Sequence, residues 1–370
     1  MADFVDVGGS VLFSVDLAAL RDVPEMLGRM ADDAKRCRLY AEEYFDFAFG
    51  PGVLNRATGR HDEAREKVRD FFRRVEHLAA AQRDAVTAAI DYYEGVDLVA
   101  AARTDALLPP TRIDPVEGRS PRLRPDLLQA RVREQNEPID ALTEPPDYST
   151  QDPYQPQWSD LVSPGNVARD ATWGVTWLGA KLGICDRAYD PLDDFVLPMT
   201  GNWAGMHACA DALANLAEAA RLLQGNADWI ALRVEAVWLG NAADACWIKV
   251  RGLAKALDAA QHPLNDLSSA YAGVVDEMKF LEGAMELLVI DLIDAVFFAT
   301  LAVATSETVV GAVVFGGAAV YEISRVVGHV NDVLSHIEKA RNAVDVFGGK
   351  TDGFGLLNTD LPALPAAPAA

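Results

Sequence analysis

The sequence predicts an all-α protein with two long antiparallel helical hairpins, similar in outline to a four-helix bundle, and a C-terminal apolar helical hairpin. Three observations favour this fold class. Apolar residues recur at steps of three and four over long stretches, which is the spacing of helices packed along a common seam. The chain of 370 residues is 50% hydrophobic but only 8% aromatic. A proline-rich stretch separates the two regions that carry the helical pattern.

The first hairpin is expected within residues 1–100. Its first helix ends at the sequence FGPG, residues 49–52, and its second begins after GRHDEA. Two long helices joined by one loop form an antiparallel hairpin. The predicted core positions of the first helix are Val23, Leu27, Met30, Ala34, Cys37, Ala41 and Tyr44. Those of the second are Ala64, Val68, Phe71, Val75, Leu78, Gln82, Ala85, Ala89, Tyr92 and Val96.

Residues 101–165 are expected to form a linker, because eleven of the 19 prolines fall there. Such a segment is extended and has little core of its own. Residues 348–370 end in LPALPAAPAA, and they are expected to form a disordered tail rich in proline and alanine.

The second hairpin is expected within residues 166–292, with its tip at residues 238–241. Its predicted core positions are Cys209, Leu213, Leu216, Ala220, Leu223, Ala227, Ile230, Val234 and Val237, followed by Cys246, Val250, Leu253, Leu257, Ala260, Leu264, Leu267, Tyr271, Val274 and Met278. In this arrangement Cys209 lies opposite a residue near position 269. It is then roughly 30 Å or more from Cys246, so no disulfide joins the two. Neither these cysteines nor Cys37 and Cys185 form a CxxC pair.

Residues 293–347 are expected to form an apolar helical segment, in which the stretch 295–321 contains one charged residue, Glu307. The uncharged runs on either side of Glu307 fall short of the ~20 residues needed to span a bilayer. Placing Glu307 at the middle of a membrane would cost about 2–3 kcal/mol or more. A buried core hairpin is therefore the favoured interpretation, and membrane insertion of residues 285–328 is the alternative.

The sequence VWLGNAADA, residues 237–245, occupies the predicted tip of the second hairpin. Gly240 fits a left-handed residue that closes the first helix. Asn241 is a suitable N-cap for the next helix, and Asp244 is placed to bond the N–H of that cap. These roles leave Trp238 unexplained, because an indole at the tip of a hairpin has little core to enter.

The pattern WxGxAAxA at the tip of a helical hairpin resembles the WXG family of type VII (ESX) secretion substrates of actinobacteria. The similarity covers roughly residues 165–325, including the lead-in PMTGNW and an apolar tail like that of a larger subgroup. Trp-x-Gly also occurs at Trp177 and Trp203, but only Trp238 stands between two apolar seams.

The N-terminal hairpin resembles the small ESX-secreted helical hairpins whose second helix ends in Tyr-x-x-x-Asp/Glu. Here YEGVD puts Tyr93 and Asp97 at that spacing, and residues i and i+4 share a helix face. The same spacing recurs at Tyr148 and Tyr189, where no helix is expected. The resemblance implies a two-part export signal composed of Tyr93, Asp97, Trp238 and Gly240.

No catalytic or metal-binding pattern is present: the chain lacks HExxH, Gly-x-Ser-x-Gly, a phosphate loop and a dinucleotide-binding fingerprint. Neither a cofactor nor a metal is expected. The histidines His61, His77, His207, His262, His329 and His336 show no ligand spacing, although His329 and His336 could share a helix face. Asp291 and Asp294 are interpreted as the polar side of a mostly buried helix.

The net charge of −22 argues against nucleic acid or an anionic membrane as a partner reached by charge alone. The N-terminus carries acidic residues where a secretory signal has basic ones, so no Sec signal peptide is expected.

Three functional hypotheses follow. The first is a non-enzymatic type VII secretion substrate, cytoplasmic before a Sec-independent export that leaves it secreted or on the cell surface. Its partners would be the ESX machinery or its recognition chaperone, with a second copy or a separate WXG protein as further candidates. The second is a secreted effector that inserts residues 285–328 into a membrane or forms a pore there. The third is a purely structural bundle in which the motif matches are incidental.

Overall fold

The computed structural model describes residues 4–6, 12–49, 58–108, 136–150, 187, 201–304, 321, 324–339 and 342. Helix accounts for 86% of the described residues, which confirms the predicted all-α class. In chain order the elements are β1 (Phe4–Asp6), β2 (Leu12–Val15), α1 (Leu17–Leu20), α2 (Asp22–Tyr44), α3 (Thr58–Gly95), α4 (Leu98–Asp105), η3 (Pro138–Ala141), η4 (Tyr148–Thr150), α8 (Trp203–Val237), β3 (Trp238–Leu239) and α9 (Asn241–Ala304).

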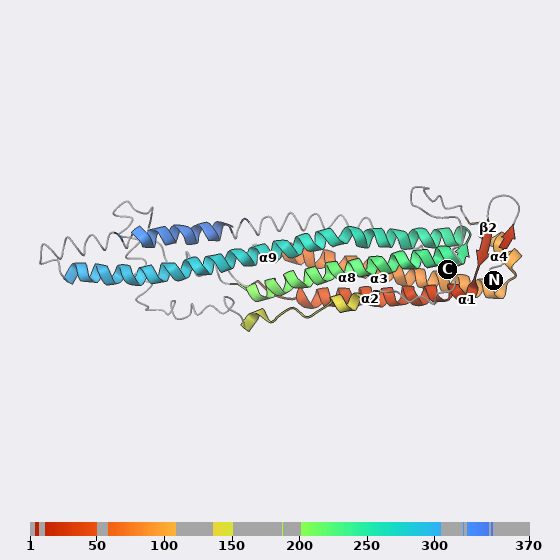
Figure 1. The fold of residues 1–370 in the computed structure, drawn as a ribbon, viewed down its shortest axis with the longest axis horizontal. Helices are drawn as coiled ribbons and strands as arrows, with labels where there is room; N and C mark the ends of the chain where they lie inside the picture. The colour runs from red at the N-terminus through yellow and green to blue at the C-terminus, as the bar shows by residue number, and fades with distance from the viewer. Residues whose placement is uncertain are drawn as a thin grey trace.

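The four long helices lie side by side in an elongated bundle (Figure 1). α2 packs along α3, and α8 packs along α9. The two pairs also contact each other, chiefly through α2 with α8 and also through α3 with α9. Their buried side chains form one continuous core. The first and second helical regions therefore share a single apolar interior.

The predicted seams of α2, α8 and the first part of α9 are buried at nearly every position that the structure describes. In α3 the prediction holds from Ala64 to Gln82 and then fails. Beyond Gln82 the buried residues are Val86, Ile90 and Tyr93, whereas Tyr92 is 40% exposed. A straight α-helix drifts by about 20° per heptad relative to a 3.5-residue repeat, so over several turns the buried stripe moves by one residue.

A three-stranded antiparallel sheet, which was not predicted from the sequence, lies at one end of the bundle. Its strand order is β1-β2-β3. β2 pairs with β3 so that Val15 lies opposite Trp238 and Ser14 lies opposite Leu239. The next residue along, Asp16, donates its backbone N–H to the carbonyl of Val237 at 2.9 Å. The N-terminal strands therefore bind the turn between α8 and α9.

α9 is almost twice as long as α8, and its C-terminal half extends beyond the other long helices (Figure 1). Residues 324–339 are helical and contribute Val326, Val330 and Val333 to the common core. Since α9 runs unbroken through residue 304, no helix end marks the boundary expected near residue 293. The centre of the expected apolar hairpin, residues 305–320, lies outside the described residues. Among the described helices, none combines the length and apolarity required to cross a bilayer.

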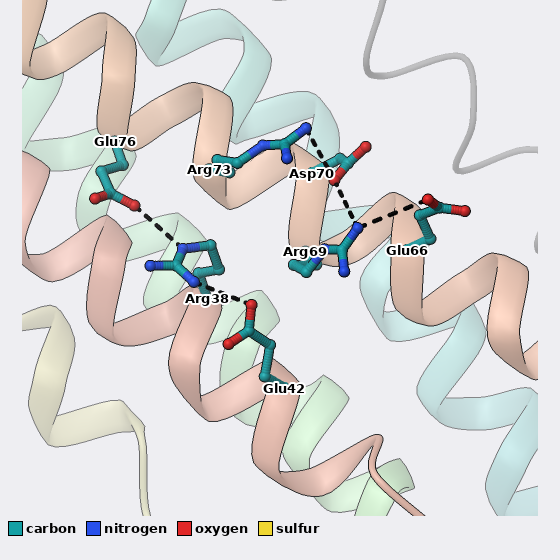
Figure 2. A network of polar contacts seen from close by, with 7 residues as sticks. All are labelled: Arg38, Glu42, Glu66, Arg69, Asp70, Arg73 and Glu76. Atoms are coloured by element: carbon teal, nitrogen blue, oxygen red, sulfur yellow. Dashed lines mark hydrogen bonds and ion pairs between the residues drawn. The ribbon is translucent and has the colours of Figure 1, made fainter.

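Charged side chains connect α2 to α3 on the outside of the bundle (Figure 2). Arg38 of α2 contacts Glu76 of α3 at 3.2 Å and Glu42 of its own helix at 3.0 Å. Arg69 contacts Glu66 and Asp70, and Asp70 also contacts Arg73, all within α3. Such half-exposed pairs contribute about 0–1 kcal/mol each. The buried seam therefore contributes more than these ion pairs to holding the two helices together.

The cysteines Cys37, Cys209 and Cys246 are free and buried, as predicted, and Cys209 contacts Tyr271 across the α8–α9 interface. Cys185 lies outside the described residues. Part of the expected linker, residues 136–150, lies on the bundle. There the Tyr40 hydroxyl donates to the carbonyl of Thr143 at 2.6 Å, and the Asn215 side chain donates to the same carbonyl at 3.0 Å.

Candidate interaction site at the bundle tip

Trp238 folds into the end of the bundle. α8 ends at Val237, and Trp238 takes an extended conformation that lets it pair with Val15 of β2. Its side chain is only 2% exposed. The strand pairing therefore explains how an indole at the tip of a hairpin reaches a core: the N-terminal strands extend the core past the ends of the helices.

Tyr93, in the last turn of α3, contacts Trp238 directly. The two ring centroids are 6.0 Å apart and the rings meet edge to face at 75°. On its other side Tyr93 meets Phe13 of β2, with centroids 5.6 Å apart. Edge-to-face aromatic pairs contribute about 0.5–1.5 kcal/mol beyond the area that they bury. The structure thus brings together the tyrosine of the first predicted motif and the tryptophan of the second.

The Tyr93 hydroxyl is held in its neutral form. Burial raises its pKa above the ordinary value of tyrosine, and the Asp105 carboxylate raises it further. The indole N–H of Trp238 partly offsets both effects by its proximity, although it makes no hydrogen bond. Tyr93 therefore acts at this site as a large neutral ring.

Gly240 has to be a glycine for two reasons. Its φ of 139° lies where L side chains rarely occur. In addition, an added Cβ would lie 2.6 Å from Oδ2 of Asp105 and 3.0 Å from Cδ2 of Phe13. Gly240 thus has the positive φ that was predicted, but it does not close α8, which ends at Val237 before the strand Trp238–Leu239. It also leaves room for a carboxylate from another helix.

Asp105, the last residue of α4, caps α9. Its carboxylate accepts hydrogen bonds from the backbone N–H of Asn241 at 2.7 Å and of Ala242 at 2.9 Å. These amides are unpaired donors at a helix N-terminus, where a negative charge is also favoured by the helix dipole. The prediction that Asn241 is the N-cap is therefore wrong. Asn241 is the first helical residue, and its side chain donates to the carbonyls of Asp105 and Leu108.

Asp97 does not share a helix face with Tyr93, so that prediction is also wrong. α3 ends at Gly95, and Asp97 caps the separate helix α4, accepting a hydrogen bond from the N–H of Ala100 at 2.9 Å. Asp97 is exposed, whereas Tyr93 is 7% exposed. Of the four predicted site residues, Tyr93, Trp238 and Gly240 form one buried cluster, and Asp97 starts the helix that carries Asp105 into it.

Phe13 and Asp105 belong to this cluster and were missed in the sequence. Phe13 lies in the four-residue stretch LFSV, which is too short to predict a strand until its partner strand is known. Asp105 lies 135 residues before Gly240, and nothing in its local sequence shows that it caps a distant helix.

The remaining candidates make structural contacts elsewhere. Asp291 is 2% exposed and contacts Arg325 at 2.6 Å and His329 at 2.9 Å, so the polar side predicted for α9 is buried here against residues 324–339. The side chain of Asp294 lies outside the part of the chain that the structure describes. His336 lies 3.5 Å from Glu277. His329 and His336 thus both face α9. Among the described residues, no three side chains of His, Cys, Asp or Glu converge as ligands for a metal ion.

Comparisons with known proteins give no relative for this chain. No protein-family model matches it, and neither the curated proteins nor the solved structures include a match.

Proposed function

We propose that this chain is a non-enzymatic substrate of a type VII (ESX) secretion system, and that the cluster at the tip is part of its export signal. The contact between Tyr93 and Trp238 carries the proposal. The two residues come from different helical pairs and are 145 positions apart in the sequence. They nevertheless lie edge to face at 6.0 Å.

In the family that the motifs resemble, a tyrosine motif and a neighbouring Trp-x-Gly turn come from two chains that pair. Here a single chain carries both, and α2–α3 packs against α8–α9. We infer that the two helical pairs imitate such a heterodimer. On this account the chain is cytoplasmic before export and secreted or cell-surface afterwards, and its partner is the export machinery or a recognition chaperone.

Replacing Tyr93 by Ala tests this proposal. The change removes the ring that meets Trp238, and we expect the amount exported into the culture filtrate to fall about tenfold or more, as a loss of about 1.4 kcal/mol in recognition would produce. The matched control is Leu78→Ala, which truncates an equally buried side chain of α3 far from the tip. Thermal unfolding of both purified variants checks that they fold.

Retention of Tyr93→Ala in the cells, with normal export of Leu78→Ala, supports the proposal. Export of folded Tyr93→Ala at the wild-type level contradicts it and favours a purely structural bundle. Equal losses for both variants would also count against it, because the defect would then follow from destabilisation alone.

A further inference from the structure

Tyr93 and Trp238 are too deeply buried to be touched by another protein. Tyr93 is 7% exposed and Trp238 is 2% exposed. If they are needed for export, as the proposed function requires, they must act through something that they hold in place. The question is therefore which exposed surface depends on the cluster at the tip.

α4 is that surface. Both of its ends are fixed by residues of the motif region: Asp97 caps its start, and Asp105 at its end bonds the first amides of α9. The Tyr92 hydroxyl also hydrogen-bonds Thr104 of α4 at 2.7 Å. Loss of the Tyr93–Trp238 contact or of the Gly240 turn would therefore disturb one end of α4, although Ala101 and Ala102 still bury the helix against the core.

The stretch that comprises α4 and the residues flanking it exposes an unusual number of large apolar side chains. Nine large apolar side chains of the described residues are exposed, and four of them, Tyr92, Val99, Leu107 and Leu108, occur between residues 92 and 108. Leu107 is the most exposed of all nine, at 85%. Clustered exposed apolar side chains at one place are typical of interaction surfaces, whereas single ones are ordinary.

We propose that the export machinery binds the surface formed by α4 and its flanking residues, with Tyr92 at the end of α3, Val99 in α4, and Leu107 and Leu108 after α4. Tyr93, Trp238, Gly240 and Asp105 are then positioning residues. This inference rests on the proposed function and assigns the contact surface within it. It moves the site of recognition from the motif residues to a neighbouring helix that lies outside both sequence patterns.

The charges around this surface specify the partner. Asp91, Asp97 and Arg103 are exposed and form no ion pair within the described residues, whereas Glu94 is paired with Arg21. A complementary protein would present an apolar groove for a short helix, with basic side chains opposite Asp91 and Asp97 and a carboxylate opposite Arg103. A membrane surface fits less well, because carboxylates flank the apolar side chains and the whole chain carries a charge of −22.

The test compares two double variants in the same export assay. Val99→Asp combined with Leu107→Asp places charges at the centre of the proposed surface. Leu39→Asp combined with Leu232→Asp does the same at exposed apolar positions elsewhere. We expect the first variant to fold and be exported roughly tenfold less or worse, because a few central apolar residues dominate such interfaces, and the second to be exported normally.

Charge and contact are tested separately. Asp91→Lys is expected to lower export, whereas Asp258→Lys, at an exposed acid of α9, is not. A benzoylphenylalanine cross-linker at position 107 should give an adduct with a second protein that forms only in cells containing the export complex and is lost with Asp91→Lys. An adduct of two copies of this chain, or with lipid, would overturn the assignment.

The two proposals fail in different ways. If Tyr93→Ala is exported normally, the proposed function fails, and this inference fails with it. If Tyr93→Ala is retained while the Val99→Asp, Leu107→Asp variant and Asp91→Lys are both exported like the wild type, the export role of the tip survives and α4 is not the bound surface.

Discussion

At the scale of single residues, the tip is held by side chains that each perform a separable task. Trp238 fills the space between the strands and α3, and Tyr93 supplies its aromatic partner. Gly240 leaves room for the carboxylate of Asp105. None of these tasks requires chemistry beyond packing and hydrogen bonding. One ring contact and one close approach therefore explain the residues of the WxG pattern in this chain.

A buried histidine far from the tip joins three helices. His61 of α3 is 2% exposed; its Nε2 lies 2.9 Å from the carbonyl of Phe45, and its Nδ1 lies 2.7 Å from the hydroxyl of Tyr271 in α9. A carbonyl can only accept, so Nε2 carries the proton and Nδ1 accepts from Tyr271. Burial lowers the pKa of His61 below its ordinary value, while the Phe45 carbonyl and Asp62 oppose this effect and Arg65 reinforces it.

Because His61 is buried, we expect the folded protein to lose stability in mild acid. Because its folded pKa is lowered, the unfolded chain binds more protons at pH values below about 6.5. Its contribution to the free energy of unfolding is then complete above pH 6.5 and is lost as the pH falls, by at most about 1.4 kcal/mol per pH unit. Urea unfolding at pH 7.5 and 5.5 measures this loss.

The matched variant for this prediction is His61→Gln, which keeps a polar side chain but cannot be charged. We expect it to be less stable than the wild type at pH 7.5 and to lose less stability between pH 7.5 and 5.5. Comparing the two proteins cancels the contribution of His207, whose pKa is also lowered, chiefly by burial. Equal losses in both proteins would show that His61 does not control the pH response.

The residue-level predictions succeeded where a side chain depends on its immediate neighbours in the sequence. The positive-φ role of Gly240 and the buried thiols of Cys209 and Cys246 follow from helix spacing and turn chemistry. The roles of Asn241 and Asp97 could not be predicted, because each depends on an element distant in the sequence. The first amides of α9 are capped by Asp105 and not by Asn241. Asp97 starts a helix that was not predicted, because residues 101–165 have the composition of a linker.

At the scale of elements, the docking of α4 on α9 depends on Asp105. Asp105→Ala removes a buried acceptor from two amides at the start of α9. Loss of a helix cap costs about 0.5–2 kcal/mol, and leaving the amides unpaired adds to that cost. We expect a decrease of about 2 kcal/mol in the free energy of unfolding, measured in urea.

Asp105→Asn is the matched variant, because it keeps one acceptor oxygen and the same shape. It should lose clearly less stability than Asp105→Ala. If both variants unfold at the wild-type midpoint, the carboxylate does not hold α4 against α9, and the account of how the tip is assembled is wrong.

The apolar repeats that form the helices could be predicted from the sequence, but the residues at which the helices end could not. The seam of α8 matches burial at every predicted position from Cys209 to Val237. The seam of α3 shifts by one residue after Gln82, which is why Tyr92 was expected in the core and Tyr93 was found there. The strands were missed because β1 and β2 are short, and because β2 pairs on its other side with β3, which lies more than 200 residues later in the sequence.

At the scale of the whole molecule, one chain packs two helical pairs around one core and closes them at a shared tip. The all-α class followed from the apolar repeats. The side-by-side packing of the pairs could be expected only from the motif resemblance, because a heptad pattern does not specify which seam meets which. The proximity of Tyr93 to Trp238 is thus a property of tertiary structure that no local pattern contains.

The measurement that tests the central claim most directly is export of Tyr93→Ala, Trp238→Ala and the double variant, compared with the wild type. If the two rings act as one unit, each single variant should be exported equally poorly, and the double variant no worse, because non-additive effects mark residues that share one interaction. Trp203→Ala is the control, since Trp203 is also buried and begins a Trp-x-Gly sequence at the opposite end of α8. It should be exported normally. Wild-type export of folded Trp238→Ala, or losses in the double variant that multiply as for independent sites, would contradict the account.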